Sequence, residues 1–161
     1  MKEKSFPRKC PNCRQRAVSP LTADYTRRIE HDGRSYDVVV TQLSHMVCAA
    51  CGDHELDLDA LDRLTVALRT SAGLLPPDEI RAKRLSLNLT QKAIAEQLDI
   101  AEATLSRWET GAQIQQRAFD TLLRAYFAVP ELRRYLSRPV TTPQRTIECP
   151  HPAALPEPAL S

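Results

Sequence analysis

The chain has 161 residues, of which 42 % are apolar and 5 % aromatic, and its formal net charge is +2. This composition argues against a deep aromatic-lined pocket, and no apolar run approaches the ~20 residues that cross a bilayer. A charge of +2 does not by itself indicate a nucleic-acid partner. Residues 1–8 lack the apolar segment of a signal peptide, so we expect a cytoplasmic protein with reduced thiols and no membrane partner.

Residues 1–54 are predicted to form a zinc-binding domain that contains a β-hairpin. Residues 25–29 alternate apolar and polar side chains and residues 36–41 are rich in β-branched ones, so both segments favour strands. The dipeptide Asp32-Gly33 between them is typical of a tight hairpin turn, because the two central residues of such a turn need positive φ. A short third strand is predicted over residues 45–47, just before the second cysteine pair.

Four of the five cysteines form two CxxC pairs, and 34 residues separate the pairs. These cysteines are Cys10, Cys13, Cys48 and Cys51. Two such turns supply four thiolates in the tetrahedral arrangement of a structural zinc site, with no position left open for catalysis. The alternatives are two unrelated buried pairs or a redox dithiol, although the sequence shows no βαβ pattern of the kind that carries a redox CxxC. His45 is a minor alternative ligand, and Cys149 is predicted to be a free, exposed thiol.

Residues 55–77 are predicted to be a helix followed by a proline-containing linker. The helix is expected over residues 55–70, where four leucines recur at spacings of three and four and form one apolar stripe. These leucines are Leu58, Leu61, Leu64 and Leu68. At the other end of the chain, residues 139–161 contain six prolines in 23 positions and are predicted to be a disordered tail.

Residues 78–138 are predicted to form a five-helix domain in which Pro130 separates the last two helices. Its clearest signal is the segment 89–111, which reads as two short helices joined by a tight turn. Thr90 is a suitable N-cap for the first helix, whereas Ala101 is a weak one for the second. Four apolar residues are expected to face inward: Leu98, Ile100, Leu105 and Trp108. The predicted fold class is therefore mainly α with a small zinc-bound β domain at the N-terminus, an α+β arrangement.

These motifs resemble known families. Residues 78–137 are similar to the helix-turn-helix domain of XRE/Cro-type repressors, and a CxxC…CxxC domain placed before such a domain resembles the MqsA-type antitoxins of bacterial type II toxin–antitoxin modules. The resemblance implies a structural zinc and an N-terminal domain that neutralises an mRNA-cleaving ribonuclease toxin. It also implies a C-terminal domain that dimerises and represses its own operator.

The second helix of the motif is predicted to contact bases in the DNA major groove. The residues predicted to contact DNA are Gln91, Glu102, Ala103, Thr104, Ser106 and Arg107. By the resemblance, Arg107 reads a base edge and Gln91 contacts a phosphate. The alternative for Arg107 is an ion pair with Glu102 or Glu109 on the protein surface. Ala103 departs from the family, whose members can carry a polar, base-reading residue at this position.

Two functions fit this sequence, and an enzyme is not expected because no catalytic motif is present and the zinc site is closed. The first function is an antitoxin and autorepressor that binds a palindromic double-stranded operator as a homodimer and also binds a toxin. The second is a stand-alone zinc-containing XRE-family regulator with no toxin partner. Three apolar residues beyond Pro130 are not needed for the core of the domain and are predicted to form the dimer surface: Leu132, Tyr135 and Leu136.

Overall fold

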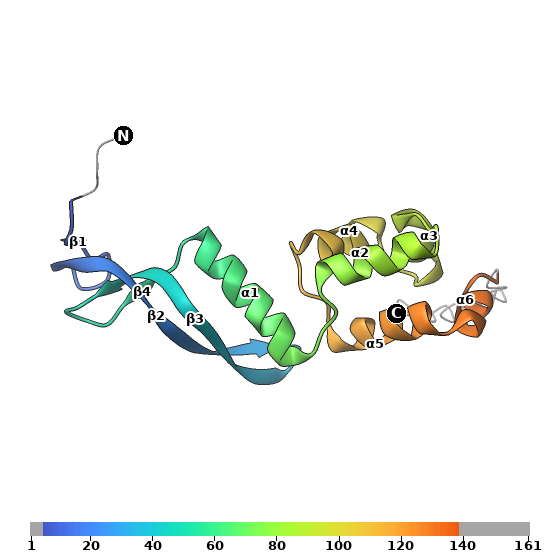
Figure 1. Ribbon diagram of the computed structural model, residues 1–161, viewed down its shortest axis with the longest axis horizontal. Coiled ribbons are helices and arrows are strands. Elements are labelled where there is room, and N and C mark those ends of the chain that lie inside the picture. Colours follow the sequence, from blue (N-terminus) through green and yellow to red (C-terminus); the bar gives the residue numbers. More distant parts are fainter. Residues whose placement is uncertain (1–4, 139–161) are drawn as a thin grey trace, which may run out of the picture.

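The computed structural model describes residues 5–138, and it has an antiparallel sheet followed by six helices. Figure 1 shows the sheet and helix α1 at one end of an elongated molecule and helices α2–α6 at the other. The α+β fold class is confirmed. The proposed tail and Cys149 lie outside the described residues. No helix within residues 5–138 is long and apolar enough to cross a membrane.

The sheet is a long hairpin with a very short strand added at each edge. Strands β2 (Arg16–His31) and β3 (Arg34–Cys48) pair antiparallel along most of their length, while β1 (Arg8–Lys9) and β4 (His54–Glu55) cover only the end nearest the cysteines. Within residues 5–138, β2 therefore pairs only with β3 from Leu21 to His31. The backbone of this stretch is an open sheet edge.

The predicted hairpin turn is confirmed, since Asp32 (φ 51°) and Gly33 (φ 70°) both adopt the left-handed conformation. The prediction of a separate third strand over residues 45–47 was wrong, because these residues are the end of β3. The strand continues through a register shift between Ala23 and Tyr25 of its partner, where the backbone N–H of Gln42 donates to the Asp24 carboxylate. A bulge of this kind bends a strand without ending it.

Helix α1 (Leu58–Ala72) covers one face of the hairpin. The Asp57 side chain accepts from the backbone N–H of Ala60, and Gly73 ends the helix in the left-handed conformation. Only part of the predicted leucine stripe is buried: Leu64 and Leu68 pack against the hairpin, whereas Leu58 is 80 % exposed. The helix begins at residue 58 rather than 55, so Leu58 lies in the first turn, beyond the packed face.

Five further helices follow, as predicted. They are α2 (Pro77–Ser86), α3 (Gln91–Gln97), α4 (Glu102–Thr110), α5 (Arg117–Ala128) and α6 (Pro130–Leu136). Their core is a single cluster of eight buried residues: Leu75, Ile80, Ile94, Leu98, Leu105, Trp108, Leu123 and Tyr126. Leu75, in the connection before α2, belongs to this cluster, and its backbone N–H donates to the buried Asp120 carboxylate.

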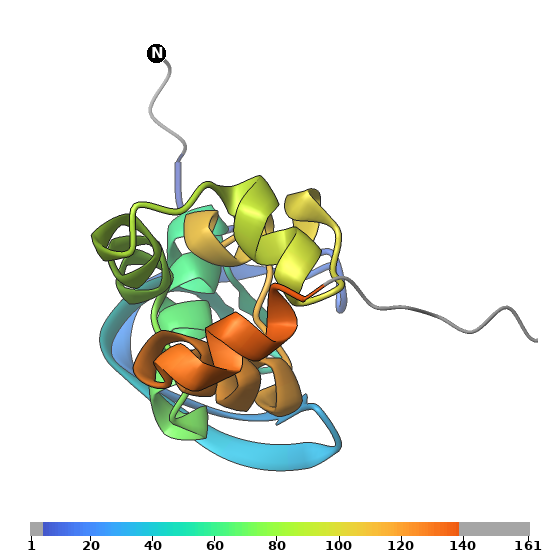
Figure 2. The same ribbon diagram turned by 90° about the vertical axis from the view of Figure 1, so that its right-hand side faces the viewer.

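The two ends of the molecule are joined by hydrogen bonds as well as by the chain. At the hairpin tip, the Asp32 carboxylate accepts from the backbone N–H of Arg117, the first residue of α5, at 2.9 Å. The His31 Nε2 atom lies 3.0 Å from the Gln115 carbonyl oxygen. Figure 2 shows the hairpin passing on the α5 side of the helical bundle, away from α3 and α4. The face that carries α4 is therefore left uncovered by the sheet.

Candidate metal centre and nucleic-acid interface

The four cysteines of the two CxxC pairs converge on one point beside the short edge strands. Cys10 and Cys13 follow β1, Cys48 ends β3, and Cys51 lies in the turn that follows. One ligand atom of each lies within 4.8 Å of all the others. The Cys13 and Cys48 sulfurs are 3.6 Å apart, and the Cys10 and Cys51 sulfurs are 3.8 Å apart.

The two cysteine turns have the same backbone hydrogen bonds, which explains why they present their sulfurs alike. In the first, the N–H of Arg14 donates to the Cys10 carbonyl at 3.0 Å, and in the second the N–H of Gly52 donates to the Cys48 carbonyl at 2.8 Å. Arg14 and Gly52 both have positive φ, at 65° and 72°. The glycine thus occupies a position where a side chain is disfavoured.

The spacing of these sulfurs fits a zinc ion. Tetrahedral coordination with Zn–S bonds of ~2.3 Å places sulfurs ~3.8 Å apart, much farther than the ~2.0 Å of a disulfide. All four cysteines are free, and the four thiolates leave no ligand position open. The protein therefore has one structural zinc site. His45 lies outside this cluster: its Nδ1 atom is 3.0 Å from the Leu43 carbonyl, and its ring packs against Tyr25 and His54.

The pKa values of the cysteines favour a bound cation at the cluster. Burial opposes ionisation of Cys48, but hydrogen bonds from the backbone N–H groups of Ala50 and Cys51 and from the Cys51 and Cys13 thiols together lower the pKa of Cys48 to about 7. The backbone N–H of Asp53 lowers the pKa of Cys51, yet burial and the neighbouring sulfurs together raise it to about 12. Without a metal, ionisation of a second thiol beside Cys48 is therefore unfavourable. Zn²⁺ binds thiolates and displaces their protons.

At the other end of the molecule, helices α3 and α4 form the predicted helix-turn-helix. The Thr90 hydroxyl accepts from the backbone N–H of Ala93 and caps α3, while Ala101 gives α4 no side-chain cap. Asp99 occupies the left-handed conformation in the turn (φ 53°). Of the four residues expected to face inward, Leu98, Leu105 and Trp108 are buried and Ile100 is half-buried against the same core.

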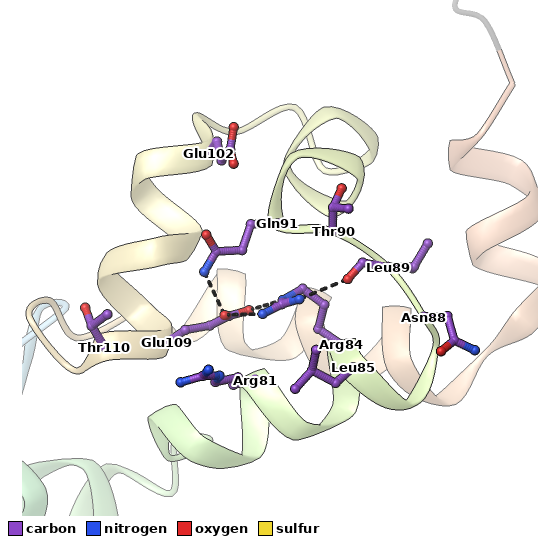
Figure 3. Close-up of a pocket in the computed structure, with 10 residues that line it drawn as sticks. All are labelled: Arg81, Arg84, Leu85, Asn88, Leu89, Thr90, Gln91, Glu102, Glu109 and Thr110. Atoms are coloured by element: carbon purple, nitrogen blue, oxygen red, sulfur yellow. Dashed lines mark hydrogen bonds and ion pairs between the residues drawn. The ribbon is translucent and has the colours of Figure 1, made fainter.

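A buried ion pair fixes the end of α4 against α2 (Figure 3). The Arg84 guanidinium donates two hydrogen bonds to the Glu109 carboxylate, at 2.6 Å and 2.8 Å, and a third to the Leu89 carbonyl. The Gln91 amide also donates to Glu109, at 2.8 Å. Burial would raise the pKa of Glu109, but these hydrogen bonds, with the charges of Arg84 and Arg81, hold it below its usual value.

In this structure Arg107 forms neither of the two ion pairs considered from the sequence. Glu109 is occupied by Arg84, and within residues 5–138 Arg107 is in no ion pair, including none with Glu102. Arg107, Glu102 and Ala103 are exposed on the outer face of α4, and Thr104 and Ser106 are half-buried. Gln91 is half-buried as well, because its amide reaches back to Glu109.

An open groove of about 660 Å³ runs between α2, α3 and the start and end of α4. Figure 3 shows Gln91, Glu102 and Arg81 around it, on three different helices. Two further residues of the groove were not predicted from the sequence: Arg81, an exposed cation on α2, and Asn88, in the connection to α3. Their position depends on how α2 crosses α4. The spacing of residues within the helix-turn-helix motif does not predict that crossing.

Comparison with known proteins agrees with this geometry. A helix-turn-helix family model matches residues 80–131, from α2 into α6. No curated protein matches the chain. Residues 80–131 are therefore a helix-turn-helix domain of the XRE type, which indicates a regulator that binds double-stranded DNA. The four-cysteine zinc site followed by this domain fits the MqsA-like arrangement, and the resemblance is confirmed at that level.

Proposed function

We propose that the protein is a dimeric repressor that reads a palindromic operator with α4 and serves as the antitoxin of a ribonuclease toxin. The observation that supports operator reading is the exposed outer face of α4, where Arg107 has no ion pair within the described residues while the end of the same helix is fixed by the Arg84–Glu109 pair. Because α4 is fixed in place and the Arg107 guanidinium is unpaired, that guanidinium can donate to the two acceptors on the edge of a guanine base.

Arg107 and Gln91 are proposed to have different roles at the operator. Arg107→Ala should remove discrimination at one base position of each half-site, by about 1–3 kcal/mol. Gln91 opens α3, where backbone N–H groups favour phosphate, so Gln91→Ala should weaken binding to all sequences about equally. Its salt dependence should change little, because a neutral side chain displaces no counterion. The remaining contacts are assigned to Glu102, Ala103, Thr104 and Ser106.

Binding to a panel of single-base operator variants tests these roles. Arg28→Ala is a matched arginine control, because Arg28 is an exposed strand residue paired with Asp37 at the other end of the molecule. Circular dichroism shows whether each variant is folded. If Arg107→Ala lowers the affinity uniformly and no position loses discrimination, Arg107 does not read a base.

The dimer is proposed to form through α6 and the residue before it. Val129 (41 % exposed) and Tyr135 (67 % exposed) leave apolar surface uncovered there, and Leu132 and Leu136 are only half-buried. Two-fold dimers place recognition helices about one DNA turn apart, which suits a palindrome. Sedimentation of the wild type and of Tyr135→Glu tests this, with a dimer expected only for the former. A wild type that is monomeric at micromolar concentration and binds one half-site would refute it.

Toxin neutralisation is assigned to residues 5–72. Its support is the MqsA-like arrangement and several exposed large apolar side chains, among them Leu21, Val39 and Leu58. The second candidate, a regulator without a toxin, has the same DNA-binding features. Co-expression with the product of an adjacent small gene decides between them, because growth rescue requires a toxin and a protein that neutralises it. If the adjacent product does not inhibit growth, the regulator alone remains.

A further inference from the structure

A second cavity lies where the two ends of the molecule meet. It has a volume of about 840 Å³ and is lined by α1, the connection to α2 and the end of α4. Much of its wall is apolar, with contributions from Val66, Leu74, Pro76 and Pro77. Its lining residues come from α1, from the connection to α2 and the start of α2, and from the end of α4 with the turn that follows. It is distinct from the zinc site, and it shares only Glu109 and Thr110 with the groove beside Gln91.

The cavity has one unusual polar group, the guanidinium of Arg69 on α1. This residue is 5 % exposed, and its Nη2 atom donates to the carbonyls of Gly111 (2.8 Å) and Gln113 (3.2 Å). Its Nε atom is buried without any hydrogen-bond partner. No carboxylate within residues 5–138 forms an ion pair with it.

Arg84, which is also buried, has the counter-charge that Arg69 lacks. Arg84 is paired through two hydrogen bonds with the Glu109 carboxylate, so its charge is compensated. Arg69 has only neutral carbonyl acceptors, and its burial lowers its pKa. Taking a cation out of water without a counter-charge is costly unless an anion or strong acceptors replace the water. Because Arg69 lines the cavity and its guanidinium has no counter-charge, the N–H groups that do not bond the Gly111 and Gln113 carbonyls are donors for an anion.

We propose that this cavity binds a small monocarboxylate with an apolar body, whose carboxylate accepts hydrogen bonds from Arg69. The apolar walls suit the body of such a ligand. Three carboxylates also line the cavity: Glu109 is paired with Arg84, whereas Asp62 and Asp78 are in no ion pair within the described residues. A dianion such as phosphate is therefore disfavoured relative to a single carboxylate. The site also adjoins Thr110 and Gly111 at the end of α4, but the proposal does not depend on an operator or a toxin.

The test uses the full-length zinc-loaded protein, ¹⁵N-labelled, and benzoate as the probe. We expect saturable shifts of the Arg69 Nε–H signal and of the Gly111 and Ala112 backbone amides. Benzyl alcohol, which has the same ring without the charge, should bind roughly tenfold more weakly or worse, as expected for loss of a charge-assisted hydrogen bond. Octanoate is a second monocarboxylate probe of different shape.

Two variants locate the site. Val66→Trp should fill the cavity and abolish the shifts while the protein stays folded, because Val66 is 60 % exposed. Its matched control is Val39→Trp, at a 53 % exposed position of β3 outside the cavity, which should bind like the wild type. Arg69→Met should weaken benzoate binding roughly tenfold or more, whereas Arg63→Met, on the same helix, should not.

Three results would overturn the proposal. The first is the absence of saturable binding by both benzoate and octanoate to the wild type. The second is unchanged binding in Val66→Trp, which would place the ligand elsewhere. The third is equal affinity for benzoate and benzyl alcohol, which would show that Arg69 serves only as a donor to the carbonyls at the end of α4.

Discussion

The sheet with its helix (residues 5–72) and the helical bundle (residues 74–138) are held together by different means. The bundle has one contiguous core of eight buried residues and a buried ion pair. The sheet and α1 have two smaller clusters, one between α1 and β3 and one made of two cysteines and Val18. The second of these is too small to fix the end of the sheet by apolar burial alone.

This difference explains why the cysteine end of the sheet needs a metal and the bundle does not. At the cysteine end of the sheet the strands β1 and β4 have only two residues each, and few large side chains are available for burial. Zinc can supply folding free energy at such a place, because it binds the folded arrangement of ligands and not the unfolded chain. The bundle has no such need, so the two parts should respond to different changes.

The largest effect is expected from loss of zinc. Cys48→Ser should release the metal, which contributes on the order of 10 kcal/mol in small zinc-dependent domains, and should leave the sheet sensitive to protease. Helices α2–α6 should persist. Metal analysis and limited proteolysis measure this, with Cys149→Ser as a control that retains zinc. A protease-resistant Cys48→Ser variant would mean that the sheet does not need its metal.

The converse change is Leu123→Ala in the core of the bundle. Leu123 is fully buried, so the cavity should cost about 2–5 kcal/mol of unfolding free energy. The zinc content should stay unchanged. The measurement is urea unfolding followed by fluorescence of Trp108, the single tryptophan of the chain, which lies in the same core. Leu85→Ala, at a position 54 % exposed on α2, is the matched control and should have little effect.

The Arg84–Glu109 pair allows a test by pH. Glu109→Gln should cost about 3 kcal/mol at neutral pH, since one partner of a buried pair is removed. The pKa of Glu109 is lowered from 4.5, so its ionised form stabilises the fold above that pH, and this contribution is lost as the pH falls through the folded-state pKa. The difference between wild type and variant should therefore shrink below pH 4.5.

Trp108 fluorescence again follows the bundle, which separates this effect from acid release of zinc. Glu131→Gln is the control, because Glu131 and Arg134 form an exposed pair and its change should be close to zero. A difference between wild type and Glu109→Gln that stays constant from neutral to acid pH would contradict the assignment.

The smallest effect tests how far the two parts are independent. Asp32→Asn should weaken the hydrogen bond to the first N–H of α5 and cost about 1 kcal/mol of bundle stability. Asparagine tolerates the left-handed conformation of this residue, so the turn should be kept. The measurements are Trp108 unfolding and the amide shift of Arg117, with Asp37→Asn as control. An unchanged Arg117 signal would show that the hairpin tip does not cap α5 in solution.

Features set by near neighbours in the chain were predictable from the sequence. The cysteine spacing, the Asp32-Gly33 turn and the capped α3 each depend on a few consecutive residues, and the structure has all of them. Features set by distant segments were not. The continuity of β3 depends on a bulge opposite Asp24, and the exposure of Leu58 depends on which turns of α1 pack against the hairpin.

The candidate sites follow the same rule. The zinc ligands could be predicted completely, because two local turns carry them. On the DNA side, the outer face of α4 could be predicted, whereas Arg81 and the contact of Gln91 with Glu109 could not. These depend on the packing of α2 against α4, and helical periodicity gives no crossing geometry for two particular helices.

The open edge of β2 has a consequence for solubility. From Leu21 to His31 its unpaired N–H and C=O groups form a template on which another chain could add a strand and start aggregation. Four charged side chains lie along this edge: Asp24, Arg27, Arg28 and Glu30. Such charges discourage edge-to-edge pairing. Replacing Arg27, Arg28 and Glu30 by threonine or valine, with Asp24 kept because it bonds the bulge, should therefore leave the fold intact while favouring fibrous precipitates during expression and storage.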